Sequence, residues 1–201
     1  MLKLPSKPIV IFILMASILL FSSFTTTNAL STKITEAETI NWRHNLKLKR
    51  SDFKASKKWV LDNSVASSYC GFGYSITDVD GDISGNIYVR FNSDKSWFNH
   101  EITDPKKVEY ILKHEQLHFD ICELFGRKMY KEVLRLISLN KLNQRTIERI
   151  QSKLEKQYSD YQKRYDKETN HSIIISKQKK WQEKIRKELS QMQQYANYST
   201  F

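Results

Sequence analysis

Residues 104–129 read DPKKVEYILKHEQLHFDICELFGRKM, and this segment separates two halves of different character. Asp104 or the preceding Thr103 can cap a helix, and Pro105 suits the first helical position. Apolar residues then recur at the three- and four-residue spacing of one helix face: Val108, Ile111, Leu112, Ile121, Leu124, Phe125 and Met129. The segment therefore predicts a long amphipathic helix from Pro105 to about Ile137.

The two halves predict an α+β fold. Val65–Thr77 and Ile83–Phe91 are rich in aromatic and β-branched residues, and an Asp-Gly step in the turn between them favours a hairpin. Helical spacing returns at about Gln144–Tyr165 and Ile175–Tyr195, whereas the link Asp166–Ser172 reads as irregular. We expect a small antiparallel sheet in the N-terminal half, then the long helix, then two further C-terminal helices.

The N-terminus predicts export. Lys3 and Lys7 precede the apolar stretch Ile9–Phe21, and small residues end at Ala29 where a signal peptidase would cleave. We expect residues 1–29 to be a signal peptide and residues 30–201 to form one domain, strand-rich over 30–104 and helical over 105–201. An uncleaved anchor is the alternative. No later segment is apolar enough to span a membrane, so the mature protein is expected to be secreted or periplasmic.

Charge and cysteines carry weaker indications. The formal charge of +11 falls to about +9 without Lys3 and Lys7. In an exported protein this charge favours an anionic envelope surface over nucleic acid, although it also suits helix faces that are simply solvated. Cys70 and Cys122 can form a disulfide in an oxidising compartment, or remain two buried thiols.

The chemistry resides in His114-Glu115-Gln116-Leu117-His118. Histidines four residues apart project from one helix face, about 6 Å from each other along the axis, and can bind one tetrahedral Zn²⁺ ion. Glu115 lies beside such an ion and is the expected general base that takes a proton from zinc-bound water. A structural role for both histidines in a helix interface is the alternative.

A catalytic zinc site needs a third protein ligand. Cys122 lies too far along the helix from His114, and Glu123 points to another side. The expected ligand is His171 in the polar link, with Asp166 as its supporting partner or as the alternative ligand. No oxyanion-stabilising residue is singled out; those available are Tyr161, Tyr165, Arg127 and Arg164.

Two motifs resemble a known family. HEQLHFDICE (residues 114–123), with Arg127 one turn on, resembles the core motif of a bacterial family of exported proteins of unknown function, commonly labelled predicted secreted zinc-dependent proteases. YDKETNHS (residues 165–172), followed by Gln178 and Trp181, resembles its second signature, in which the Asp, Thr and His recur. Weaker similarity extends the resemblance to about residues 38–190. Ser172 departs from the Gly that usually follows the His, and Lys49-Arg50 from an expected Trp.

The resemblance implies a zinc site of His114, His118 and His171, with Asp166 and Thr169 as supporting or alternative groups. The expected function is hydrolysis of a peptide or protein substrate by a zinc-dependent protease with Glu115 as general base. The alternative is a catalytically silent extracytoplasmic protein that binds zinc or docks on the envelope.

Overall fold

The computed structural model describes residues 38–56, 64–80, 82–198 and 200–201. The chain divides into residues 1–34 and a compact unit of residues 35–201, which contains all the helices and strands described. The predicted signal peptide, residues 1–29, lies outside the described residues.

The main sheet is antiparallel, with three strands in the order β1-β4-β3: β1 (Thr39–Asn41), β3 (Cys70–Val79) and β4 (Asp82–Asn92). β3 and β4 form the predicted hairpin, which closes where Val79 faces Asp82. The alternation in β4 places three side chains in the core, since Ile87, Val89 and Phe91 are all buried. A separate two-stranded sheet joins β2 (Ala66–Ser67) to β5 (Trp97–Phe98).

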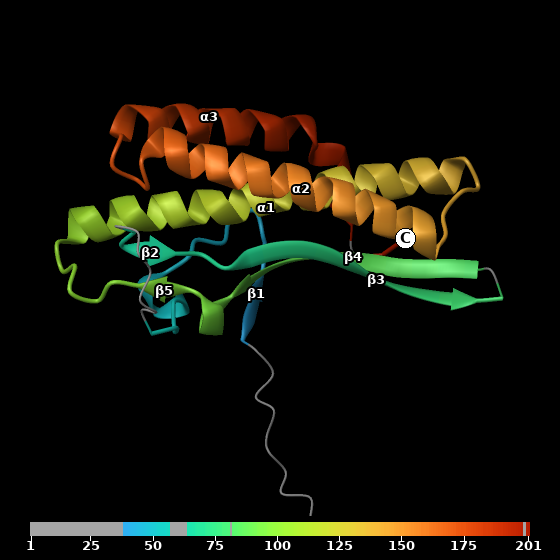
Figure 1. Ribbon diagram of the computed structural model, residues 1–201, viewed down its shortest axis with the longest axis horizontal. Coiled ribbons are helices and arrows are strands. Elements are labelled where there is room, and N and C mark those ends of the chain that lie inside the picture. The colour runs from blue at the N-terminus through green and yellow to red at the C-terminus, as the bar shows by residue number, and fades with distance from the viewer. Residues whose placement is uncertain (1–37, 57–63, 81, 199) are drawn as a thin grey trace, which may run out of the picture. The chain divides into compact units, whose positions relative to one another are not determined.

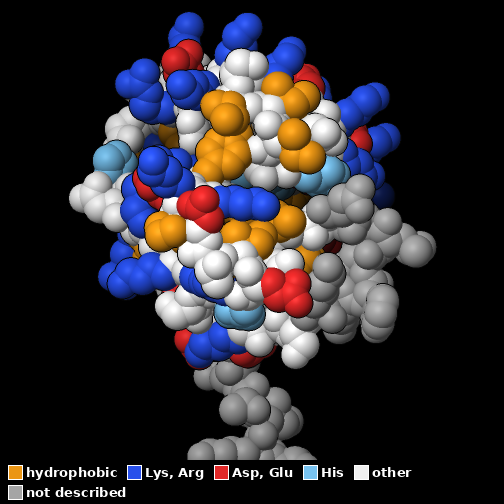
Figure 2. Space-filling model, turned by 90° about the vertical axis from the view of Figure 1, so that its left-hand side faces the viewer, with side chains coloured by type: hydrophobic (Ala, Val, Ile, Leu, Met, Phe, Trp, Pro, Cys, Tyr) orange, Lys and Arg blue, Asp and Glu red, His pale blue; other side chains and the backbone are white. Residues whose placement is uncertain are grey.

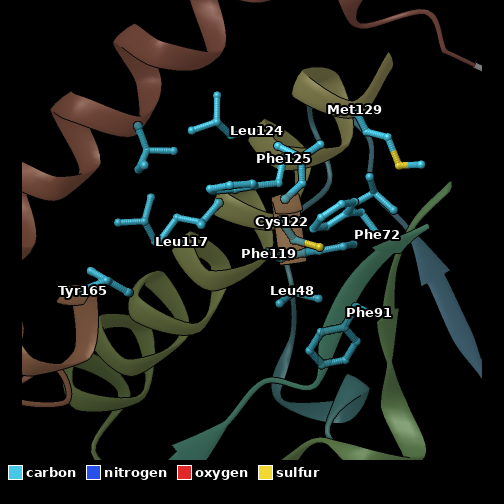
Figure 3. Packing of buried hydrophobic residues seen from close by; sticks show 14 of the residues in the cluster. Leu48, Phe72, Phe91, Leu117, Phe119, Cys122, Leu124, Phe125, Met129 and Tyr165 are labelled. Atoms are coloured by element: carbon cyan, nitrogen blue, oxygen red, sulfur yellow. The ribbon is translucent and has the colours of Figure 1, made fainter. Parts of the chain in front are cut away.

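The long helix α1 (Pro105–Ser138) lies against the sheet (Figure 1). It begins as predicted, because the side chain of Asp104 accepts hydrogen bonds from the backbone of Lys106 and Lys107. Gly126 permits close contact with β4, since a β-carbon there would lie 2.4 Å from Cγ2 of Val89. The core fills the space between this helix, the sheet and the other helices; Figure 3 shows part of it: Leu48, Phe72, Phe91, Leu117, Phe119, Cys122, Leu124, Phe125, Met129 and Tyr165.

Two further helices complete the helical half: α2 (Gln144–Thr169) and α3 (Ile175–Gln191), both of which contact α1. Figure 1 shows α3 on the side of α1 away from the sheet, whereas α2 crosses α1 and approaches β3, where the hydroxyl of Tyr158 donates to the carbonyl of Cys70. Short 3-10 helices occupy Arg50–Asp52, Ser93–Lys95 and Gln193–Tyr195. The α+β prediction, with strands before residue 104 and helices after it, is confirmed.

The end of α2 differs from the prediction. The helix continues past Tyr165 to Thr169, so the first part of the expected irregular link is helical. Tyr165 and Thr169 are both buried one turn apart, and the hydroxyl of Thr169 donates to the carbonyl of Tyr165. Packing of this last turn therefore stabilises a helix that polar composition alone does not predict. Asn170, with a φ of 49°, ends it.

The third helix is shorter than predicted, because its last turn to Tyr195 is a 3-10 helix. Among the residues that the structure describes, no helix combines the length and hydropathy that a membrane crossing requires.

Candidate metal centre

Three side chains from two helices converge on one point. Nε2 of His114 and Nε2 of His118, both on α1, lie 3.2 Å apart. Oδ1 of Asp166, on α2, lies 3.2 Å from the first and 3.0 Å from the second. Among the described residues these three form the cluster of potential metal ligands. The two histidines that the sequence singles out therefore meet a carboxylate from a distant segment.

The triangle has the size that a zinc ion requires. Ligands about 2.0–2.1 Å from a tetrahedral ion are separated from one another by about 3.3 Å. The observed separations of 3.0–3.2 Å approach this value. Imidazole nitrogens and carboxylate oxygens are also common ligand atoms of Zn²⁺, so the three residues fit the ion.

Two glutamines orient the imidazoles. Oε1 of Gln162 lies 2.6 Å from Nδ1 of His118, while its Nε2 donates to the carbonyl of His118 at 3.0 Å. Oε1 of Gln178 lies 3.0 Å from Nδ1 of His114. A carbonyl oxygen only accepts, so each Nδ1 carries a proton, and each Nε2 is the atom that faces Asp166 and is available to a metal ion.

Tyr165 contacts both His114 and Gln178 and so helps to hold them in place. Its ring stacks on that of His114 with centroids 4.6 Å apart, and its hydroxyl lies 2.7 Å from Oε1 of Gln178. Gln162 was not anticipated from sequence, because a glutamine on a charged helix face carries no signal of its own. In the sequence, Gln178 and Tyr165 stand out only as parts of the motif that resembles the family's second signature. Tyr165 is also one of the residues available to stabilise an oxyanion.

The electrostatics of the cluster favour a cation. Burial opposes ionisation of Asp166, but hydrogen bonds from His114 and His118 outweigh it and hold the pKa of that carboxyl well below its usual range. Burial likewise opposes the charged form of His118, yet the hydrogen bond and charge of Asp166 raise the pKa of His118 to about 10. The proton on His118 thus supplies the positive charge that pairs with the ionised carboxyl of Asp166.

Glu115 is a buried carboxylate in the cleft of the cluster. Its side chain is 3% exposed. Among the described residues, its Oε2 atom is buried and has no hydrogen-bond partner. A buried carboxylate oxygen without a partner is costly, and such atoms in native proteins commonly mark a ligand, a water molecule or a catalytic role. Glu115 also lines the same cleft as the three converging side chains.

The cleft has a volume of about 340 Å³. One wall is the segment 64–68, which includes β2, and the other is formed by α1, α2 and the turn that follows α2. Its polar lining brings Lys163 and Tyr158 close to the converging ligands. None of the four candidate oxyanion donors lines it: Tyr161, Tyr165, Arg127 and Arg164. A larger groove of about 850 Å³ lies elsewhere, between α1, α3 and residues 42–48, and contains none of the three converging residues.

The predicted third ligand lies beside the cluster. Nδ1 of His171 is 3.8 Å from Oδ1 of Asp166, and the His171 side chain is 45% exposed. Asp166, which the sequence predicts as the alternative ligand, lies within 3.2 Å of both α1 histidines. Thr169 does not face the ligands, because its hydroxyl donates to the carbonyls of Tyr165 and Asp166 and holds the last turn of α2.

The turn that carries His171 has an unusual backbone. Asn170, His171 and Ser172 all have positive φ, at 49°, 49° and 75°. This left-handed region strains a residue with a β-carbon and favours glycine. Ser172 is therefore strained at the position where the family motif usually has Gly. The strained turn brings His171 and Ser172 to the rim of the cleft.

The two cysteines, Cys70 on β3 and Cys122 on α1, are neighbours in the structure. Both are free thiols in the structure, and their side chains are hydrogen-bonded to each other. Sγ of Cys70 lies 3.5 Å from the carbonyl of His118. The hydrogen bond from Cys122 lowers the pKa of Cys70, whereas burial raises the pKa of Cys122. Their proximity agrees with the predicted pairing, and the disulfide itself stays a prediction.

The other excluded residue behaves as predicted. Glu123 is fully buried on another side of α1, where its carboxylate forms an ion pair with Arg127 at 2.7 Å. It is directed toward the protein interior and takes no part in the metal cluster.

Comparisons with known proteins place this site in a recognised sequence segment. No curated protein and no solved structure matches the chain. Residues 97–172 match the model of a family described as bacterial protein of unknown function (DUF922). The matched segment begins at β5, contains all of α1 and α2, and ends at the strained turn, so it includes the three converging side chains and Glu115, whereas Gln178 lies beyond it.

Proposed function

We propose that this protein is an exported bacterial zinc-dependent hydrolase that cleaves peptide bonds. One observation carries the proposal: two imidazole nitrogens and a carboxylate oxygen converge within 3.2 Å of one another. Glu115 lines the same cleft, and its buried Oε2 atom has no hydrogen-bond partner among the described residues. A purely structural zinc site favours four closed protein ligands and has no need of such a base.

His114, His118 and Asp166 would hold the ion. Zinc would supply a Lewis acid that polarises the substrate carbonyl and lowers the pKa of water. Glu115 takes the proton of the attacking water and returns it to the leaving amine. Gln162 and Gln178 keep the imidazoles in the tautomer that ligation requires.

His171 is the next nearest donor. At 3.8 Å from Asp166, on a strained turn, its imidazole could reach the ion after a small movement or could bind the substrate instead. Metal affinity separates the two roles. A ligand's loss lowers affinity for zinc, whereas loss of a substrate-binding side chain lowers only turnover.

Peptide substrates suit the wall opposite the ligands. In the part of the chain that the structure describes, β2 pairs with β5 alone, so we expect its other edge to bind an extended chain. The side chains along this wall are small, namely Ser64, Val65, Ala66, Ser67 and Ser68. Main-chain pairing here would lay a peptide bond across the cleft.

The first experiment is zinc content of the purified protein by elemental analysis. We expect about one zinc per chain, lost in His118→Ala and Asp166→Ala. Asp160→Ala is the matched control, since it removes an exposed carboxylate from the same helix. His44→Ala controls for loss of an exposed histidine outside the cleft. Full zinc content in His118→Ala would exclude the metal assignment.

The second experiment tests turnover with Glu115→Gln, which keeps the size of the side chain and removes its basicity. We expect unchanged zinc content and loss of cleavage of a peptide library. Wild-type cleavage by this variant would remove Glu115 from the mechanism. One zinc per chain without cleavage by the wild-type protein would favour the catalytically silent zinc-binding alternative.

A further inference from the structure

Three consecutive isoleucines project from the turn between α2 and α3. Ile173, Ile174 and Ile175 are 68%, 40% and 56% exposed. Single exposed apolar residues are common on protein surfaces, but a contiguous group of large aliphatic side chains marks an interaction site. We call residues 173–175 the isoleucine tip.

The exposure is built into the fold. The amide of Ile173 donates to the carbonyl of Asn170, and the amide of Ile174 donates to the carbonyl of Thr169. These bonds fix the turn after the strained residues and direct the isoleucines outward. The tip is therefore held exposed by backbone hydrogen bonds, and none of its residues lines the cleft of the metal centre.

Basic residues flank the tip on both sides in the chain. Residues 163–180 contain six Lys or Arg residues and two carboxylates, a net charge of +4. One of the two carboxylates, Asp166, faces the histidines of the metal centre. The exposed lysines are Lys163 and Lys167 on α2 and Lys177, Lys179 and Lys180 on α3. Figure 2 faces this end of the molecule and shows hydrophobic side chains in its upper part among Lys and Arg side chains.

We propose that the isoleucine tip and its surrounding lysines dock the protein on an anionic lipid bilayer. A projecting apolar tip can enter the boundary between head groups and acyl chains, where a ring of lysines meets the lipid phosphates. The charge complementarity is specific to an anionic surface, and a projection offers less to a flat protein partner than to a bilayer that it can penetrate.

Docking would also place the metal centre at the membrane. His171 and Ser172 line the cleft and immediately precede the tip in the chain. A bilayer in contact with the tip therefore brings the cleft close to substrates at the membrane surface. The docking itself is independent of the proposed hydrolysis and can be tested without it.

The test is co-sedimentation of the full chain with vesicles of phosphatidylcholine plus phosphatidylglycerol, and with vesicles of phosphatidylcholine alone. The variant Ile173→Ser/Ile174→Ser/Ile175→Ser removes the tip. The matched control is Ile137→Ser/Leu139→Ser, which changes side chains 43% and 48% exposed near the α1–α2 connection. All proteins carry the same N-terminal residues, so differences between them measure the tip. Equal zinc content and thermal midpoints verify folding.

We expect the tip variant to bind anionic vesicles about tenfold more weakly than the wild type, and the control to bind as the wild type does. Lys177→Glu/Lys179→Glu/Lys180→Glu should weaken vesicle binding at low salt. The binding that remains should depend little on the salt concentration. Equal binding by the tip variant and the wild type would overturn the proposal. A tip variant that loses only peptide cleavage would also overturn it, because the tip would then be a substrate subsite. A tip variant that loses only self-association would do the same, because the partner of the tip would then be a second copy of the chain.

Discussion

Ser172→Gly should stabilise this protein, although it removes a buried side chain. Ser172 has a φ of 75° and is 7% exposed. Its β-carbon strains the backbone in the left-handed region, and glycine removes that strain. The same position usually holds glycine in the family that the motif resembles, so the expected change restores the residue that the turn favours.

The magnitude follows from two opposing contributions. A left-handed φ costs a residue with a β-carbon about 1–2 kcal/mol. Glycine loses roughly 0.5–1 kcal/mol more conformational free energy on folding than a residue with a side chain. The net gain in unfolding free energy is about 0.5–1 kcal/mol, which raises the thermal midpoint of a chain of this size by about 1–4 °C.

The assay is thermal unfolding followed by circular dichroism, with Ser176→Gly as the control. Ser176 lies in the first turn of α3, where the backbone is right-handed and glycine lowers helix stability by about 0.5 kcal/mol. The same substitution four positions apart should therefore have opposite signs. A lower midpoint for Ser172→Gly would show that the turn is not strained in solution, or that the lost side-chain packing outweighs the strain.

Three other predictions concern the metal centre and the thiols. Zinc added to metal-free protein should raise the thermal midpoint of the wild type, because zinc at a hundredfold excess over Kd adds about 2.7 kcal/mol to the free energy of unfolding. The midpoint of His118→Ala should not change. Gln162→Ala should weaken zinc affinity by about 10- to 100-fold in competition with a chelator, while Lys163→Ala, beside it on α2, should not. In denaturant, which exposes both side chains, Cys70 and Cys122 should resist alkylation in the oxidised protein and react only after reduction, as mass spectrometry would show; labelling of both before reduction would contradict the pairing.

The local elements were predictable from sequence because their signals are local. Asp104 and Pro105 determine where α1 begins, and the spacing of His114 and His118 places both imidazoles on one helix face. The Asp-Gly turn and the alternation in β4 predict the hairpin. These features depend only on neighbours within a few residues, so an α+β fold with a long helix that carries two histidines on one face follows from the chain alone.

The remainder of the site depends on packing between distant elements. Asp166 lies on the last turn of α2, which is helical because Tyr165 and Thr169 are buried against the rest of the fold. Sequence placed Asp166 in an irregular link and ranked His171 ahead of it as a ligand. Gln162 carries no sequence signal at all.

The sequence by itself determined that two histidines and a glutamate share a helix and that zinc is the ion such a motif favours. Only the tertiary structure decided that Asp166 faces both histidines and that Gln162 and Gln178 orient their rings. The physical reason is that helix periodicity fixes side-chain directions within one helix. The rotation and depth at which α2 and α3 pack on α1 depend on the summed contacts of the whole core.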